Sequence, residues 1–258
     1  MIDTHCHILP GIDDGPRDIS ESIAMCRMAE SEGIRTIVAT PHMLYDIYTF
    51  SNEDIRTKAT LLNESLDRAA IGVTVLPGAE VAISPEIPEL LRQGRLMTIS
   101  DTGRHIILEL TDIFPAEAVI DLVRQIRALN IIPIITHPER NPQIRKDPGY
   151  VKKLVTLDSL IQITGMSLTG DFGAAAKKTA LTLLKEGLVH IIASDAHSAQ
   201  WRPPLLAGAI AEAAKIVGFD AARAMVDEMP RRLIGEHKYS EFSGRHSLDA
   251  FASSGQYS

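Results

Sequence analysis

The chain has 258 residues, of which 45% are apolar and 23% charged, a balance that supports one sizeable core and excludes disorder of the whole chain. Its 26 Lys and Arg against 33 Asp and Glu give a formal charge of −7, with the nine histidines counted as neutral. Proteins that bind nucleic acid mainly through phosphate contacts usually carry a basic surplus, so this charge argues against that class.

The first residues, Met-Ile-Asp-Thr-His-Cys-His, lack the basic and apolar segments of a secretory signal. No apolar run reaches the ~18 residues that a membrane-spanning helix needs. We therefore expect a cytoplasmic protein that does not insert into a membrane. Two cysteines, Cys6 and Cys26, are too few for a disulfide scaffold, and neither is followed by an Arg six positions later. A Cys-x5-Arg phosphatase loop is thus excluded.

Short apolar runs rich in β-branched residues predict seven strands at near-regular spacing. These runs are Ile2–Thr4, Arg35–Ala39, Val73–Leu76, Ile106–Leu110, Ile132–Thr136, Ile161–Thr164 and His190–Ala193. The segments between them have helical periodicity. Asp18–Glu32, with Ile19 among its apolar residues, is followed by Gly33 as a stop signal, and Ala116–Leu129 has a broad apolar face that begins at Ala118. Alternating strands and helices predict an α/β fold with a mostly parallel sheet.

No linker rich in Gly, Pro or Ser divides the chain, and no repeat is visible, so we predict a single domain over residues 1–239. Residues 240–258 are polar and Ser-rich with scattered aromatics. This composition predicts a disordered C-terminal tail, to which we assign no function.

Ionisable side chains follow or end six of the seven predicted strands. In chain order they are His5 and His7, His42, Glu80, Glu109, His137, and Asp195 with His197. A closed barrel brings the carboxyl ends of all its strands to one face, whereas an open doubly wound sheet gathers ligands between few strands. The pattern therefore favours a distorted (βα)7 barrel of the TIM-like kind. It does not decide whether the barrel has an eighth strand.

The first strand gives the sharpest metal signal. Side chains alternate along a strand, so both imidazoles of His5 and His7 point to one side, where they can bind one ion. Cys6 lies between them, faces away and is not expected to be a ligand. A lone His near a strand end is more often structural than a ligand, so the metal hypothesis depends on the joint pattern.

The remaining four histidines serve as a comparison. His105 and His190 precede their strands, which places them at the opposite end of a barrel, and His237 and His246 lie in or near the tail. None of these four is predicted to join the cluster.

The segment Asp13-Asp14-Gly15 adds carboxylates after the first strand, and the residues alone do not decide whether Asp13 or Asp14 is the ligand. With one of them counted, the set holds five histidines and four carboxylates. Nine groups are too many for one ion, so they suit two or three. Nitrogen and oxygen donors without thiolate suit Mn, Fe or Zn.

Two arginines follow the proposed ligands closely. Arg140 lies three residues after His137, and Arg202 lies five residues after His197. A bidentate guanidinium beside a metal cluster is well suited to hold phosphate oxygens.

These motifs resemble the PHP (polymerase and histidinol phosphatase) superfamily. More closely they resemble its bacterial metal-dependent protein tyrosine phosphatases of capsule and exopolysaccharide clusters, the CpsB/YwqE type. The similarity runs from residue 1 to about 236, and six motifs occur in order: His5-Cys-His7, Gly11-Ile-Asp-Asp-Gly15-Pro16, Thr40-Pro-His42, Gly78-Ala-Glu80, Thr136-His-Pro-Glu-Arg140 and Ser194-Asp-Ala-His197. The resemblance implies the PHP fold, a distorted (βα)7 barrel, with three divalent ions, usually manganese.

The resemblance also implies roles for single residues. It assigns His5, His7, Glu80 and Asp195 to one ion, Glu80, Glu109 and His137 to a second, and Asp14, His42 and His197 to a third. It favours Asp14 over Asp13 and places Arg140 and Arg202 at phosphate-binding positions, so that Arg140, Arg202, Asp195 and His42 form the predicted catalytic set. The segment after His42 departs from the family pattern, and we expect its Tyr45, Tyr48 and Phe50 to pack on the barrel rim.

The resulting hypothesis is a phosphomonoesterase in which a metal-bridging hydroxide attacks phosphorus. Its expected partner is a phosphotyrosine protein, a bacterial tyrosine kinase of capsular or exopolysaccharide biosynthesis. Histidinol phosphate or another small phosphomonoester is an alternative substrate that nearly the same ligands would serve. The identity of the substrate protein and the oligomeric state stay open.

Three further alternatives have less support. A TatD-like nuclease also begins with a sequence such as Asp3-Thr-His-Cys-His7, but His42, the Asp195-x-His197 pair and the negative charge argue against it. A barrel that only binds a partner would lack ligands, and none of the nine is missing. An amidohydrolase would need a bridging group such as Lys where Glu80 and Glu109 stand.

Overall fold

The computed structural model describes residues 1–43, 48–111 and 114–235, and its strands form two parallel sheets. The first sheet has the order β1-β2-β4, and the second has the order β3-β5-β6-β7-β8-β9. The strands are β1 Ile2–Cys6, β2 Thr36–Ala39, β3 His42–Met43, β4 Thr74–Pro77, β5 Glu80–Ala82, β6 His105–Glu109, β7 Ile132–Thr136, β8 Leu160–Thr164 and β9 Ile191–Ala193.

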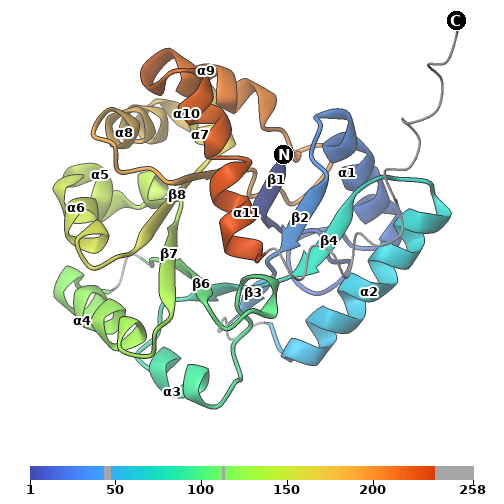
Figure 1. The fold of residues 1–258 in the computed structure, drawn as a ribbon, viewed down its shortest axis with the longest axis horizontal. Helices are drawn as coiled ribbons and strands as arrows, with labels where there is room; N and C mark the ends of the chain where they lie inside the picture. Colours follow the sequence, from blue (N-terminus) through green and yellow to red (C-terminus); the bar gives the residue numbers. More distant parts are fainter. Residues whose placement is uncertain (44–47, 112–113, 236–258) are drawn as a thin grey trace, which may run out of the picture.

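These strands occupy seven positions, because β2 continues into β3 and β4 into β5 after short breaks. Gly78 lies in the second break, where an added Cβ would come within 2.6 Å of the Val38 side chain. The last strand is joined to the first, since Asp195 N–H donates to His5 O and His7 N–H donates to Ala196 O, both at 2.8 Å. The seven predicted strands are confirmed, and they follow one another around a ring (Figure 1).

Most helices surround this ring, and the last one lies across its middle (Figure 1). They are α1 Ile19–Ser31, α2 Asn52–Arg68, α3 Ile87–Arg92, α4 Ala116–Arg127, α5 Pro142–Lys146, α6 Gly149–Val155, α7 Gly165–Thr169, α8 Gly173–Lys185, α9 Ala207–Val217, α10 Phe219–Ala224 and α11 Glu228–Ile234, with short 3-10 helices η1 Ile99–Asp101 and η2 Pro138–Arg140. The predicted Asp18–Glu32 helix is confirmed as α1, which Asp18 caps by accepting hydrogen bonds from the backbone of Ser20 and Glu21.

Two details of the predicted helix faces are wrong. Ile19 is 38% exposed, because it lies in the first turn of α1 where the helix end is open to solvent. Ala118 is exposed, because it lies beside the buried stripe of α4 and not within it.

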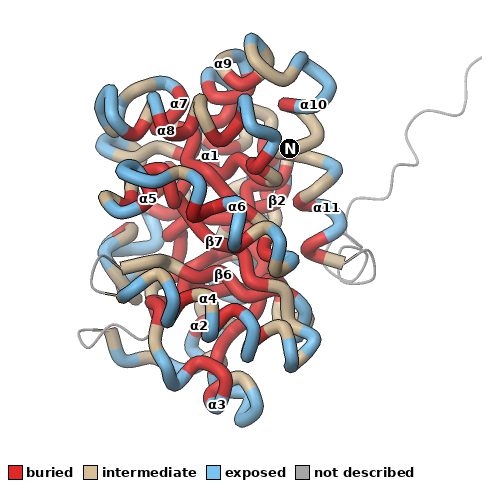
Figure 2. Tube along the Cα trace, turned by 90° about the vertical axis from the view of Figure 1, so that its left-hand side faces the viewer, coloured by how far each residue is buried: buried red, intermediate tan, exposed pale blue. Residues whose placement is uncertain are grey.

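The interior of the ring is apolar at the amino ends of the strands. Ile2, Val38 and Ile191 pack there with Leu233 and Ile234 of α11. Figure 1 shows α11 lying across the middle of the ring, and Figure 2 shows buried residues along the strands inside it. Because α11 covers the amino ends of the strands, polar side chains can gather at the opposite, carboxyl ends.

Three sequence predictions lie outside the described residues: the position of Tyr45, the exclusion of His237 and His246 from the cluster, and the tail over residues 240–258. The single domain over residues 1–239 stays a prediction. No helix in the described part of the chain has both the length and the apolar character needed to cross a bilayer.

Candidate metal centre

The predicted ligands converge at the carboxyl ends of the strands. Three groups have donor atoms within 4.8 Å of one another: His7, Asp14, His42 and His197; His5, His7 and Glu80; and His42, Glu80 and Glu109. The two other predicted ligands adjoin them, since His137 Nε2 lies 2.9 Å from Glu80 Oε1 and Asp195 Oδ1 lies 3.4 Å from His5 Nε2. The structure thus brings all nine residues to one place.

This grouping differs in part from the one that the resemblance implied. His7 lies in the group of Asp14 as well as in that of His5, and His42 adjoins Glu80 and Glu109. His137 keeps its expected place, with Nε2 2.9 Å from Glu80 Oε1 and 3.6 Å from Glu109 Oε1. His42 stands where β3 begins, opposite Glu80 in the register with β5. The break after β2 therefore lets its imidazole lie between two of the groups.

Glu80 lies at the centre and supplies the test of whether a cation fits. Its Oε2 is buried and accepts no hydrogen bond from the described residues. Three ring nitrogens surround this oxygen at 3.1 to 3.5 Å, from His5, His7 and His42. A buried oxygen without a partner is costly, and a carboxylate oxygen among imidazole nitrogens is a donor set that divalent cations accept. The residues present fit a metal.

Asp195 links the histidines to the two arginines. Its Oδ1 faces His5, whereas its Oδ2 accepts a hydrogen bond from Arg140 Nη1 and forms an ion pair with Arg202 Nη2, both at 2.5 Å. Asp195 has a φ of 53°, and His137 also has a positive φ, of 32°. Backbone strain of this kind is concentrated at functional sites, where the surrounding structure holds it in place.

The ionisation of the central groups favours cation binding. Burial opposes the charged form of Glu80, but the neighbouring His5 and His137 outweigh it and hold the pKa of this carboxyl well below its usual range. Burial likewise opposes a charge on His7, but the neighbouring carboxylates of Asp13 and Glu80 raise the pKa of this imidazole to about 10. A metal ion that binds His7 therefore displaces a proton.

Sequence reasoning missed Gln162 as a site residue. It lies on β8, the strand that contributes no predicted ligand, and its Nε2 is 2.7 Å from His5 Nδ1. Its Oε1 accepts a hydrogen bond from Thr4 Oγ1. Such a contact to the second ring nitrogen fixes the orientation of a histidine ligand. The available signal was a polar residue inside an otherwise apolar run.

Asp13, which the sequence could not separate from Asp14, has a different role. Its Oδ2 lies 2.7 Å from His7 Nδ1 and accepts a hydrogen bond from the His42 backbone, while its Oδ1 accepts one from Gly15. All these contacts direct it at the backbone and at the outer nitrogen of His7. Asp14 instead points its Oδ1 to His42 and His197, at 3.5 and 3.4 Å.

The Asp13 contacts lead to a prediction. Asp13→Ala should weaken metal binding by about 10- to 100-fold, because the His7 ring loses the carboxylate that orients it. Competition with a chelator measures this affinity. Asp18→Ala is the matched control, since Asp18 caps α1 and should affect stability alone. Equal metal affinity in the two variants would contradict the assigned role.

The structure also places four residues that were not predicted to be ligands. Tyr48 stacks on His42 with ring centroids 5.9 Å apart, so it lies against the cluster and not only on the rim. Phe50 packs against the apolar core, as expected of a rim residue. Cys6 is buried in that core, and His190 lies at the opposite end of β8, where its Nδ1 accepts from Ile161 N–H.

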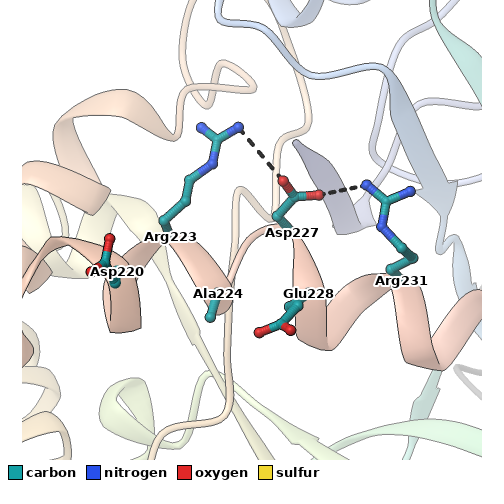
Figure 3. A pocket seen from close by; sticks show the side chains of 6 residues that line it. All are labelled: Asp220, Arg223, Ala224, Asp227, Glu228 and Arg231. Carbon is teal, nitrogen blue, oxygen red and sulfur yellow. Dashed lines mark hydrogen bonds and ion pairs between the residues drawn. The ribbon is translucent and has the colours of Figure 1, made fainter.

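A separate charged hollow lies between α10 and α11. Figure 3 shows Asp227 between Arg223 and Arg231, with which it forms ion pairs at 3.7 and 2.9 Å. The same connection holds the amino end of β1, because Ile2 N–H donates to Val226 O. The hollow is therefore at the end of the ring opposite the candidate metal centre.

Comparison with known proteins gives consistent matches. A family described as "Capsular polysaccharide synthesis, CpsB/CapC" matches residues 1–235. The tyrosine-protein phosphatase YwqE of Bacillus subtilis is 40% identical over 206 residues, which cover 78% of this chain and 79% of YwqE.

Solved structures agree with these matches. A structure from a study of YwqE from Bacillus subtilis and CpsB from Streptococcus pneumoniae, described as unique metal-dependent tyrosine phosphatases, has a TM-score of 0.86 and 36% identity. The match covers 91% of this chain and 94% of that one. Histidinol phosphate phosphatase from Lactococcus lactis has a TM-score of 0.55 at 11% identity, with 88% and 93% covered, and shows a shared fold alone.

Proposed function

Because the chain belongs to the CpsB/CapC family of capsular polysaccharide synthesis, we propose that it is a metal-dependent protein tyrosine phosphatase. The observation that carries this proposal is the meeting of a His and carboxylate cluster with two arginines at one residue, Asp195. The relatives YwqE and CpsB are described as metal-dependent tyrosine phosphatases, which supports the same reaction here.

The proposed metal ligands are those predicted from the sequence: His5, His7, Asp14, His42, Glu80, Glu109, His137, Asp195 and His197. Nine donors suit three divalent ions if Glu80 is shared, and their mixed nitrogen and oxygen chemistry suits manganese, with iron or zinc as alternatives. Bound divalent cations supply Lewis acidity, which activates a water nucleophile at neutral pH and offsets charge on phosphoryl oxygens.

The arginines would bind the phosphate. Arg140 and Arg202 both form ion pairs with one oxygen of Asp195, so their guanidinium groups already converge at the edge of the cluster. A phosphate dianion at this edge can accept the N–H groups that do not contact Asp195. These contacts hold the ester beside the ligands and stabilise the charge that grows on its oxygens during transfer.

The proposed mechanism assigns no residue as a general acid, and a tyrosine phosphate suits such a mechanism. A tyrosine phenolate has a pKa of about 10, so it departs with less help from a proton donor than an alkoxide needs. Tyr48, stacked on His42, adds an aromatic surface beside the cluster. This supports an aryl phosphate as the substrate, and we propose a tyrosine kinase of capsule or exopolysaccharide synthesis as its source. A cytoplasmic location stays a prediction.

A panel of substrates tests the proposal. Purified protein with added manganese is given a phosphotyrosine peptide, a phosphoserine peptide, histidinol phosphate and DNA. We expect the highest kcat/KM on the phosphotyrosine peptide. A preference for histidinol phosphate would replace the protein phosphatase by a small-molecule phosphatase, and degradation of DNA alone would contradict both.

A further inference from the structure

Two guanidinium groups share one aromatic ring at the edge of the cluster. The Phe172 ring centroid lies 4.7 Å from Arg140 Cζ and 5.5 Å from Arg202 Cζ. A guanidinium within about 6 Å of a ring centroid is attracted to the negative face of the ring. Phe172 thus contacts both arginines, although its position in the sequence gives no sign of this.

The aromatic ring offsets an excess of positive charge beside Asp195. Both arginines form ion pairs with the same oxygen of Asp195, so one carboxylate charge faces two positive charges. An aromatic face attracts cations without occupying any N–H donor. Arg202 Nε, for example, is buried and has no hydrogen-bond partner among the described residues. The ring therefore holds the guanidinium groups while donors stay available for an anion.

The turn that carries Phe172 is built to hold it. Phe172 lies between α7 and α8, and its backbone N–H donates to Met166 O of α7 at 3.4 Å. Gly170 and Gly173 on either side have φ of 104° and 88°, a region that favours glycine. The chain therefore turns sharply on both sides of the ring. The Phe172 backbone is fixed by α7, which follows the strand that carries Gln162.

We propose that Phe172 is a positioning residue of the phosphate site, whose ring orients Arg140 and Arg202 for binding phosphate oxygens. This inference rests on the proposed function in its choice of phosphate as the anion. In this role Phe172 binds neither metal nor substrate and acts only through the two arginines.

The test uses the full chain loaded with manganese and inorganic phosphate as the probe. The fluorescence of Trp201 measures phosphate binding, because Trp201 is the single tryptophan, is 83% exposed and directly precedes Arg202. Phe172→Leu should weaken phosphate affinity about tenfold, since two cation–π contacts are lost, and should lower kcat/KM on a phosphotyrosine peptide to a similar extent. Metal content should not change. Phe172→Tyr, which keeps the ring, should restore both values.

Two controls make the inference falsifiable. Phe219→Leu removes a ring that is 66% exposed on α10 and should change neither phosphate affinity nor kcat/KM. In a chain with Arg140→Ala and Arg202→Ala, Phe172→Leu should add no further loss, because its effect passes through the arginines. Phe172→Met, of similar size, repeats the test if the leucine variant does not fold.

Undiminished phosphate affinity in Phe172→Leu, or an equal further loss in the chain without the arginines, would overturn the inference. If phosphate affinity depends on Phe172 as expected but the chain does not hydrolyse the phosphotyrosine peptide, the proposed function is wrong and the inference about Phe172 stands.

Discussion

Glu80→Gln should leave a folded chain that binds less metal and hydrolyses phosphotyrosine more than about 100-fold more slowly. One Glu80 oxygen accepts a hydrogen bond from Thr136 and lies 2.9 Å from His137, and the other faces three imidazole nitrogens. An amide offers one oxygen and no negative charge. Because the loss of a group that merely orients a ligand costs about 10- to 100-fold, the loss of a shared ligand should cost more.

Metal analysis of the purified variant and kcat/KM on a phosphotyrosine peptide measure this effect. Glu139→Gln is the matched control, because Glu139 is equally buried but accepts its hydrogen bonds from Thr164 N–H and Ser167 Oγ, neither of which belongs to a proposed ligand. Glutamine can accept both bonds, and burial already raises the pKa of Glu139. If Glu80→Gln kept its metal and its rate, Glu80 could not be the shared ligand.

Removal of the arginines should separate phosphate binding from metal binding. Arg140→Ala and Arg202→Ala should each lower kcat/KM by about 10²-fold, as expected when one donor to the charge of the transition state is lost. Metal content should stay as in the unchanged chain, because the arginines contact Oδ2 of Asp195, whereas its other oxygen, Oδ1, faces His5 of the cluster.

Kinetics and metal analysis on the same preparations check this expectation. Arg127→Ala is the control, since Arg127 is a partly exposed arginine of α4 whose side chain pairs with Asp158. It should have no effect on kcat/KM. An unchanged rate in both active-site variants would exclude the arginines from phosphate binding, and a loss of metal would show that they act on the cluster instead.

The fold could be predicted because its signals are local. Each predicted strand is a short β-branched run, and six of the seven are ended or followed by an ionisable residue, so strand position and functional end appear together in the sequence. The pairing of His42 with Glu80 then follows from neighbouring strands in register. The helix faces were less certain, as Ile19 and Ala118 show, because apolar residues at a helix end or beside the buried stripe need not be covered.

The supporting contacts could not be predicted, because they join residues far apart in sequence. Gln162 reaches His5 across 157 positions, and Phe172 meets Arg140 and Arg202 from a turn that carries no motif of its own. The distinction between Asp13 and Asp14 depends on which way each side chain turns within one loop. Asp13 and Asp14 are adjacent residues of the same type, so the sequence pattern cannot tell which one is the ligand.

The central claim is that this cluster holds divalent cations and that they are needed for phosphotyrosine hydrolysis. The most direct measurement removes metal from the purified chain with a chelator, counts the ions, and follows hydrolysis of a phosphotyrosine peptide as manganese is returned. We predict no turnover in the metal-free chain and a rate that rises with bound metal, up to about three ions per chain. Full turnover without metal, or metal uptake without any hydrolysis, would contradict the account.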